Sequence, residues 1–146
     1  MIKKMFLLSL SLVLVLPVCS CSGVEKAEVA AYTVNEIETV NVVADSVSPD
    51  GLTYTITNNS DETVAYSHYY HLDVEQNGVW YHVKEKKEMV VLMIRPATAA
   101  GKADTYECNW RERYGSLSEG HYRLVKQFGF DGTFEKYYIA AEFTVD

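Results

Sequence analysis

The chain has 146 residues, with 13 Lys and Arg against 20 Asp and Glu, a formal net charge of −7, and 48% apolar residues. That length accommodates one domain, at roughly 100–200 residues per domain. The apolar fraction is too high for an intrinsically disordered chain. The excess of acidic residues argues against a nucleic-acid-binding protein, because such a protein needs a basic face.

The first 20 residues differ from the rest and are typical of an export signal. Lys3 and Lys4 are followed by twelve uncharged, mostly aliphatic residues from Met5 to Leu16. This stretch has the length of the apolar region of a signal peptide and is too short to cross about 30 Å of hydrocarbon. A buried helix or a membrane anchor is disfavoured because polar sequence follows Ser20 at once. Residues 1–20 are therefore predicted to be a signal peptide.

The sequence that follows resembles a bacterial lipobox, in which a small residue directly precedes the cysteine that is lipidated. With Cys21 as the lipid attachment residue, Ser20 takes the small position, whereas with Cys19 the bulky Val18 would take it. The resemblance implies an acylated (palmitate-bearing) lipoprotein, held by its N-terminal lipid at the extracytoplasmic face of a bacterial cell membrane, inner or outer. Several acyl chains anchor a protein firmly where a single chain is marginal. A soluble secreted protein is the alternative.

Removal of the predicted signal peptide changes both the cysteine count and the net charge of the chain. If Cys19 leaves with the signal and Cys21 is acylated, Cys108 stays alone and cannot form an intrachain disulfide. Residues 21–146 then number 126 and carry 11 − 20 = −9 formal charges. Residues 21–35 are predicted to be the lipidated N-terminus and a flexible polar tether, with a reach of about 20 Å from roughly 5–6 Å × √n. The folded domain is expected over residues 36–146.

From residue 36 onward the apolar residues alternate with a period of two, which is typical of β-strands. Turn-forming residues separate the runs, and no run has a convincing helical period. We expect seven or eight antiparallel strands in a sandwich or barrel. The expected strands cover residues 37–44, 52–57, 72–76, 79–83, 89–94, 105–110, 121–128 and 137–145. The expected core contains Tyr54, Ile56, Leu72, Val74, Tyr81, Tyr106, Trp110, Tyr122, Leu124, Ile139 and Phe143.

A β-hairpin is predicted around Asn77-Gly78. This dipeptide between two alternating runs favours a type I′ turn, which needs positive φ at both positions. A two-residue loop places Asp73 opposite His82 and makes one face of the hairpin apolar. The face predicted to point to solvent carries His71, Asp73, Glu75, Trp80, His82 and Lys84.

A tyrosine corner is predicted at the start of the strand over residues 121–128. Leu117, Gly120 and Tyr122 have the spacing of that feature, in which the tyrosine hydroxyl binds backbone a few residues upstream. The corner stabilises the crossover between two sheets, so it favours a Greek-key sandwich over a barrel. A ligand contact is the alternative role for Tyr122.

These features together resemble the small bacterial immunoglobulin-like domain of cell-envelope lipoproteins. The resemblance covers about residues 36–146 and is most specific from Trp110 to Lys126, where Tyr114-Gly115 and Leu117 precede the tyrosine corner. It implies an all-β fold, an immunoglobulin-like Greek-key β-sandwich, and an envelope location. It carries no catalytic residues. The loop around Pro96 is longer than such domains usually have.

One candidate metal site lies on the predicted hairpin. His71, Asp73 and His82 fall on its solvent face, and imidazole and carboxylate groups are suitable Zn²⁺ ligands. A flat, exposed cluster lacks the supporting shell that a metal site needs. The favoured interpretation is therefore an ordinary solvated polar face, with no metal or other cofactor.

Aromatic residues offer a second candidate surface. Tyr69-Tyr70 and Tyr137-Tyr138 are adjacent pairs, so one member of each must point away from the core, and Trp80 lies on the polar face of the hairpin. Tyr and Trp are enriched at protein interfaces and sugar-stacking platforms. Trp80, Tyr69, Tyr70 and Tyr138 are thus candidates for a partner or glycan surface, or simply cover for strand edges.

The sequence offers no catalytic motif, and Cys108 is expected to be a small inert core residue, so an enzyme is not predicted. The apolar run Met89–Ile94 is expected to be a buried strand, with strand addition by a partner as the alternative. Three functions stay open. They are a non-catalytic module that binds an envelope protein, glycan or cell-wall binding through the aromatics, and metal or solute binding on the 71–84 hairpin.

Overall fold

The computed structural model describes residues 23–88, 90 and 94–146, so the predicted signal peptide, Cys21 and most of the strand predicted over residues 89–94 lie outside it. The described residues contain strands and no helix, and hence no helix long and apolar enough to cross a membrane. The strands are β1 (Lys26–Val29), β2 (Val40–Ser48), β3 (Gly51–Asn58), β4 (Val64–Tyr66), β5 (His71–Gln76), β6 (Val79–Val83), β7 (Ala97–Thr98), β8 (Lys102–Asn109), β9 (Gly120–Phe130) and β10 (Tyr137–Val145). The expected number of seven or eight strands is too low. The sequence does not indicate β1, β4 and β7, because they are only two to four residues long and show no alternation.

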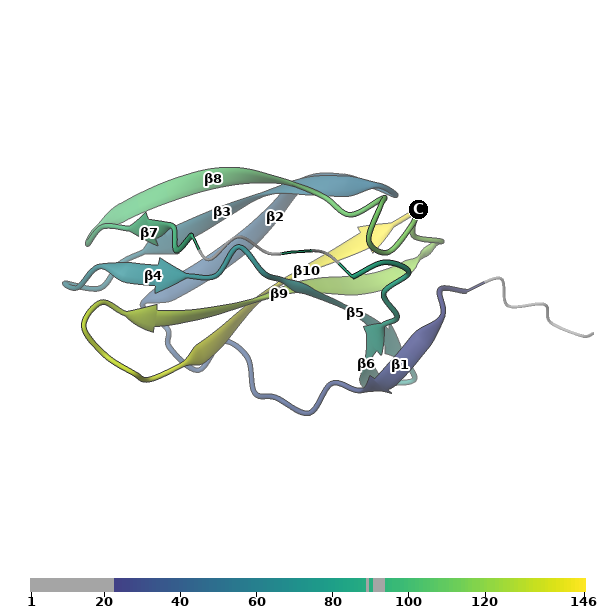
Figure 1. Cartoon of the computed structure of the whole chain (residues 1–146), viewed down its shortest axis with the longest axis horizontal. Helices are drawn as coiled ribbons and strands as arrows, with labels where there is room; N and C mark the ends of the chain where they lie inside the picture. Colours follow the sequence, from purple (N-terminus) through teal and green to yellow (C-terminus); the bar gives the residue numbers. More distant parts are fainter. Residues whose placement is uncertain (1–22, 89, 91–93) are drawn as a thin grey trace, which may run out of the picture.

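Two antiparallel sheets form a sandwich, which confirms the predicted fold class (Figure 1). The smaller sheet has the order β2-β3-β8. The larger sheet is built on β9, which pairs with β10 along one side. Along its other side β9 pairs with β5 near its start and with β4 near its end. The larger sheet therefore splits into two branches, one continuing through β6 to β1 and the other ending at β7.

The core lies between the sheets and contains the residues expected there. Two of the eleven, Tyr81 and Tyr106, are half-buried and pack on it, while the others are buried. Cys108 is a buried free thiol on β8, as predicted, and burial raises its pKa. Lys126 on β9 is an unexpected member, with only 2% of its surface exposed.

The hairpin forms as predicted. Asn77 and Gly78 have φ values of 54° and 77°, and Asp73 pairs with His82. The tyrosine corner is also confirmed, because the Tyr122 hydroxyl donates a 2.8 Å hydrogen bond to the Ser118 carbonyl. A Cβ atom on Gly120 would lie 3.1 Å from the Tyr122 ring, which explains why glycine suits that position.

Trp110 and Leu117 support the crossover from the core side. Both are buried, and the Trp110 indole donates a 2.8 Å hydrogen bond to the Pro49 carbonyl. The Trp110 ring stacks on Phe143, and Phe143 stacks on Tyr122. This row of rings joins the loop after β8 to β10 and β9 of the larger sheet.

The prediction of a flexible tether up to residue 35 is wrong from residue 26 onward. Residues 26–29 form β1 on the free edge of β6, and the Ala30 amide donates a 3.0 Å hydrogen bond to the Trp80 carbonyl. The chain then crosses the outer face of the larger sheet, and the Asn35 amide donates to the Tyr138 carbonyl at 2.8 Å. We call residues 23–35 the N-terminal strap. It forms because β6 has an unpaired edge and because the polar outer face can be covered by Tyr32.

Candidate functional site

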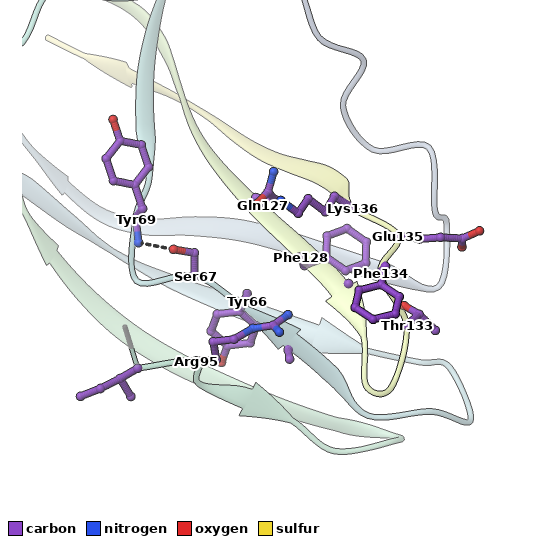
Figure 2. Close-up of a pocket in the computed structure, with 13 residues that line it drawn as sticks. Tyr66, Ser67, Tyr69, Arg95, Gln127, Phe128, Thr133, Phe134, Glu135 and Lys136 are labelled. Carbon is purple, nitrogen blue, oxygen red and sulfur yellow. Dashed lines mark hydrogen bonds between the residues drawn. The ribbon is translucent and has the colours of Figure 1, made fainter. Parts of the chain in front are cut away.

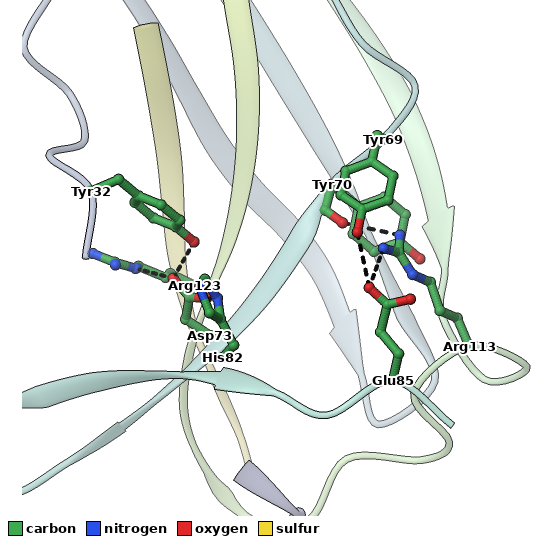
Figure 3. A network of polar contacts seen from close by, with 8 residues as sticks. All are labelled: Tyr32, Tyr69, Tyr70, Asp73, His82, Glu85, Arg113 and Arg123. Carbon is green, nitrogen blue, oxygen red and sulfur yellow. Dashed lines mark hydrogen bonds and ion pairs between the residues drawn. The ribbon is translucent and has the colours of Figure 1, made fainter. Parts of the chain in front are cut away.

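The polar face of the hairpin lies beneath the strap. Asp73 has no exposed surface, and its Oδ1 atom lies 2.8 Å from His82 Nδ1 on the paired strand. Its Oδ2 atom accepts hydrogen bonds from Arg123 Nε at 2.8 Å and from the Tyr32 hydroxyl at 2.7 Å (Figure 3). The expectation of an exposed, solvated face is therefore wrong here. Its reason is Tyr32, which the strap brings over the sheet.

The three residues considered for metal binding do come together, with Asp73 hydrogen-bonded to His82 and the His71 ring beside that of His82. The rings of His71 and His82 are 5.4 Å apart, and burial, with a smaller effect of His82, lowers the pKa of His71. Both oxygens of Asp73 already have protein partners. Within the described part of the chain no group of three or more His, Cys, Asp or Glu side chains is placed to hold a metal ion.

Two of the predicted surface aromatics, Trp80 and Tyr138, are half-buried around this cluster. The Arg123 guanidinium lies over the Trp80 ring, 4.5 Å from its centroid. The Tyr138 ring stacks on Tyr32 at 4.9 Å, and its hydroxyl accepts a 3.1 Å hydrogen bond from Gln127. One face of each ring is thus occupied by the protein itself.

The other two, Tyr69 and Tyr70, surround a second buried cation. Arg113 is 2% exposed, and its Cζ atom lies 4.2 Å from the Tyr69 centroid and 5.0 Å from that of Tyr70 (Figure 3). Arg113 donates to Glu85 at 2.6 Å and to the Tyr70 carbonyl at 3.0 Å. This ion pair lowers the pKa of Glu85. The four aromatics therefore belong to two clusters and do not form one flat platform.

A pocket of about 460 Å³ opens at the other end of the larger sheet (Figure 2). We call it the hairpin-tip pocket, because it lies between the β9–β10 turn (residues 131–136) and residues 94–95, over β4 and β9. Its floor includes Ala65 paired with Gly129. A Cβ atom at Gly129 would lie 2.5 Å from the Glu135 carbonyl oxygen. Glycine at this position is therefore what allows the turn to fold over the sheet.

The rim of the hairpin-tip pocket combines exposed apolar and cationic side chains. Phe134 is fully exposed and Ile94 is 58% exposed. The expectation of a buried strand over Met89–Ile94 is therefore wrong at its two described residues, Val90 and Ile94, which are exposed and not in a strand. Arg95 and Lys136 are also exposed, and neither makes an ion pair with another described residue. With Glu135 the charged lining amounts to 2 − 1 = +1, on a chain of −7.

A smaller pocket of about 260 Å³ adjoins the first one. The two share Ser67, Tyr69 and Gln127, and the smaller one continues to His71 and Tyr138. Ser67 and Tyr69 lie between the end of β4 and the start of β5, and Gln127 lies on β9, so the break between the two strands hollows the sheet beside β9. An elongated depression thus runs along β9, and two of the predicted aromatics help to line it.

Apart from Tyr69, sequence reasoning missed the residues of the hairpin-tip pocket. Phe134 stands alone between the turn formers Asp131-Gly132 and the charged pair Glu135-Lys136, and that isolation was the available signal. Arg95 lies far away in sequence, and only the pairing of β4 with β9 and β7 brings it close. The lining offers hydroxyl, amide and charged groups, which can donate and accept hydrogen bonds.

Comparison with known proteins agrees with this architecture. No curated protein matches the chain. The model of a protein family described as a bacterial Ig-like domain matches residues 35–144 and so covers three quarters of the sequence. That range includes every strand except β1 and the last residue of β10, together with the tyrosine corner and the hairpin-tip pocket. The chain belongs to the bacterial Ig-like domain family.

Proposed function

We propose that the protein is a lipid-anchored interaction module of the bacterial cell envelope. In this proposal Cys21 carries the lipid, the domain lies outside the cytoplasmic membrane, and it binds an envelope protein without catalysing a reaction. The Ig-like fold supports the role of interaction module, because such sandwiches present rigid strands and loops as binding surfaces.

The observation that carries the proposal is the exposure of Phe134. Phe134 has its whole surface in water beside a pocket that it lines together with the exposed Ile94, so a partner that covered both side chains would remove apolar area from water. Buried aromatic residues are common anchors of protein interfaces. The β9–β10 turn with Phe134 lies at the opposite end of the sandwich from residue 23, where the described chain begins (Figure 1).

The strap shortens the connection to the proposed anchor. Because β1 begins at Lys26, only residues 22–25 separate Cys21 from the folded domain. At 3.3–3.6 Å per residue they span at most about 14 Å. The β1 end is therefore held near the membrane, and Phe134 is presented away from it.

Site-specific photocrosslinking in intact cells tests the partner. A photoreactive amino acid in place of Phe134 is expected to give a covalent adduct with one envelope protein. The matched control is Val43, which is 60% exposed on the smaller sheet. Adducts from neither position, or equally from both, would contradict the proposed binding surface.

The anchor has its own test in cell fractionation. Cys21→Ser is expected to abolish labelling by an alkyne analogue of palmitate and to release the protein from membranes. Cys19→Ser is the matched control and should leave both unchanged. If the Cys21→Ser protein stays in the membrane fraction, lipid anchoring at this residue is wrong.

A further inference from the structure

We propose that the depression along β9 receives an extended, acidic segment of a partner polypeptide. The segment would place an apolar side chain against Phe134 and a carboxylate between Arg95 and Lys136. This inference rests on the proposed function, because it names the chemistry of the partner that the module binds.

Shape supports an extended occupant. The hairpin-tip pocket of about 460 Å³ and the adjoining pocket of about 260 Å³ share lining residues and follow one strand. A compact ligand would need a single enclosed cavity, whereas side chains of an extended chain enter successive pockets. The close-up of the larger pocket shows Arg95 reaching into it from one wall and Phe134 lying at the other (Figure 2).

Charge indicates an acidic occupant. The chain is strongly acidic, and most of its buried or half-buried cations already have carboxylate partners, as in Arg113–Glu85 and Arg123–Asp73. Arg95 and Lys136 have no carboxylate of the described residues within ion-pair distance, as is also true of Lys26, Lys86, Lys102 and Lys126. What sets the two apart is that both line the hairpin-tip pocket. Complementary charges steer encounter and give specificity. On an acidic protein, an acidic partner meets attraction at such a site and repulsion over much of the remaining surface.

Position favours a polypeptide over an anionic membrane. A bilayer also offers acyl chains and negative charge, so Phe134 with Lys136 and Arg95 could in principle touch lipid. The β9–β10 turn, however, lies at the far end of the sandwich from β1, which the proposed anchor holds near the bilayer (Figure 1). A partner on the side away from the membrane fits this arrangement.

Fluorescence anisotropy on the full chain purified in detergent tests the inference. The probe is a labelled peptide, Ser-Glu-Phe-Glu-Leu-Glu-Ser, and its control is the same peptide with glutamine at each glutamate. We expect binding of the acidic peptide, and at least about fivefold weaker binding of the glutamine peptide, because charge complementarity is lost. Raising the salt from 50 to 300 mM is expected to weaken the acidic complex by a similar factor, because exposed charges are screened.

Matched variants distinguish the effect of charge at the pocket on peptide binding from the effect of the overall charge of the protein. Arg95→Gln with Lys136→Gln is expected to weaken the acidic peptide at least about fivefold, since both complementary charges are removed. Lys84→Gln with Lys87→Gln removes the same charge from exposed residues near the β1 end and should change binding less than twofold. Arg95→Lys with Lys136→Arg keeps both charges and should bind like the original protein.

Several results would overturn the inference. They are equal binding of the two peptides, an Arg95/Lys136 double variant that binds like the original protein, and charge-dependent binding to phosphatidylglycerol vesicles in place of the peptide. If these occur while a crosslink from position 134 to an envelope protein is still found, the module binds a partner of other chemistry. If the crosslink fails, the proposed function is wrong whatever the peptide does.

Discussion

Tyr32 donates a 2.7 Å hydrogen bond to the buried carboxylate of Asp73, 41 residues further along the chain. Tyr32 comes from the strap and Asp73 from the middle of the larger sheet, so this bond joins a segment that precedes the family match to the centre of the matched domain. Burial and the adjacent carboxylate raise the pKa of Tyr32, so the phenol stays a donor. The strap therefore belongs to the fold.

Tyr32→Phe keeps the stacking on Tyr138 but removes the hydroxyl. We expect a loss of about 2 kcal/mol in the free energy of unfolding, because a bond to a buried charged group is removed. Urea denaturation measures the loss, and limited proteolysis should show faster cleavage within residues 23–35. Tyr137→Phe is the control, because its hydroxyl binds Glu135 at an exposed site and should matter by less than about 0.5 kcal/mol. Equal effects of the two changes would mean that the strap contributes nothing specific.

Asp73 and Arg123 are expected to be strongly coupled. Asp73→Ala leaves the guanidinium of Arg123, which is 5% exposed, without its carboxylate and should destabilise the protein by about 3–5 kcal/mol. Adding Arg123→Met removes the uncompensated charge, so the double variant should be more stable than Asp73→Ala alone. A double-mutant cycle by urea denaturation measures this coupling. Additive effects would contradict a tight buried ion pair.

His71 makes this face of the sheet sensitive to acid. Its pKa in the folded protein is lowered, chiefly by burial and then by His82, while Asp73 and Glu85 oppose the shift. His71 is therefore protonated near pH 6.5 in the unfolded chain but only at lower pH in the folded protein. The contribution of His71 to the free energy of unfolding falls as the pH drops through 6.5.

The comparison is between His71→Gln and the original protein in urea at pH 7.5 and pH 5.5. His71→Gln is expected to lose less stability over this interval, since it has no imidazole to protonate. His68→Gln alters an exposed histidine and should behave like the original protein. If both variants match the original protein, His71 does not contribute to acid sensitivity.

Local features of the fold could be predicted from the sequence, whereas burial by segments that are distant in sequence could not. Asn77-Gly78 defines its turn through backbone geometry alone, and the spacing of Gly120 and Tyr122 defines the corner, so both follow from a few adjacent residues. The burial of Asp73 depends on Tyr32 and Arg123, which lie 41 and 50 residues away. Alternation assigns Asp73 to the outer face correctly, but it does not show that the strap covers that face.

The candidate site was hidden for the same reason. Alternation turns Trp80 and Tyr138 outward, yet Arg123 and Tyr32 from other segments pack on them. Phe134 lies in a turn, where alternation predicts nothing, and its exposure follows from how the turn folds over Gly129. Residues outside regular strands need the tertiary structure before their exposure is known.

Lys126 is expected to destabilise the domain below pH 8. Its amine lies between the sheets, 5.4 Å from the centroid of Tyr54 and 5.8 Å from that of Tyr66, and burial lowers its pKa to about 8. Below that pH both folded and unfolded chains carry the proton, so the cost of burying a charge is fully present. Between pH 8 and the ordinary lysine value near 10.4 the unfolded chain binds more protons, so this contribution to stability improves as the pH rises.

Lys126→Met removes the charge and keeps much of the volume, so it is expected to stabilise the protein by about 1–4 kcal/mol at pH 7. The measurement is the difference in free energy of unfolding between the variant and the original protein, which should shrink as the pH rises from 8 to 10. Using the difference reduces the opposing effect of Cys108, whose pKa is raised by burial and lowered in part by Lys126. Lys102→Met changes an exposed lysine and should give a small difference that is constant with pH. A Lys126→Met protein that is less stable at pH 7 would instead mean that the amine's contacts with the two tyrosine rings outweigh the cost of its burial.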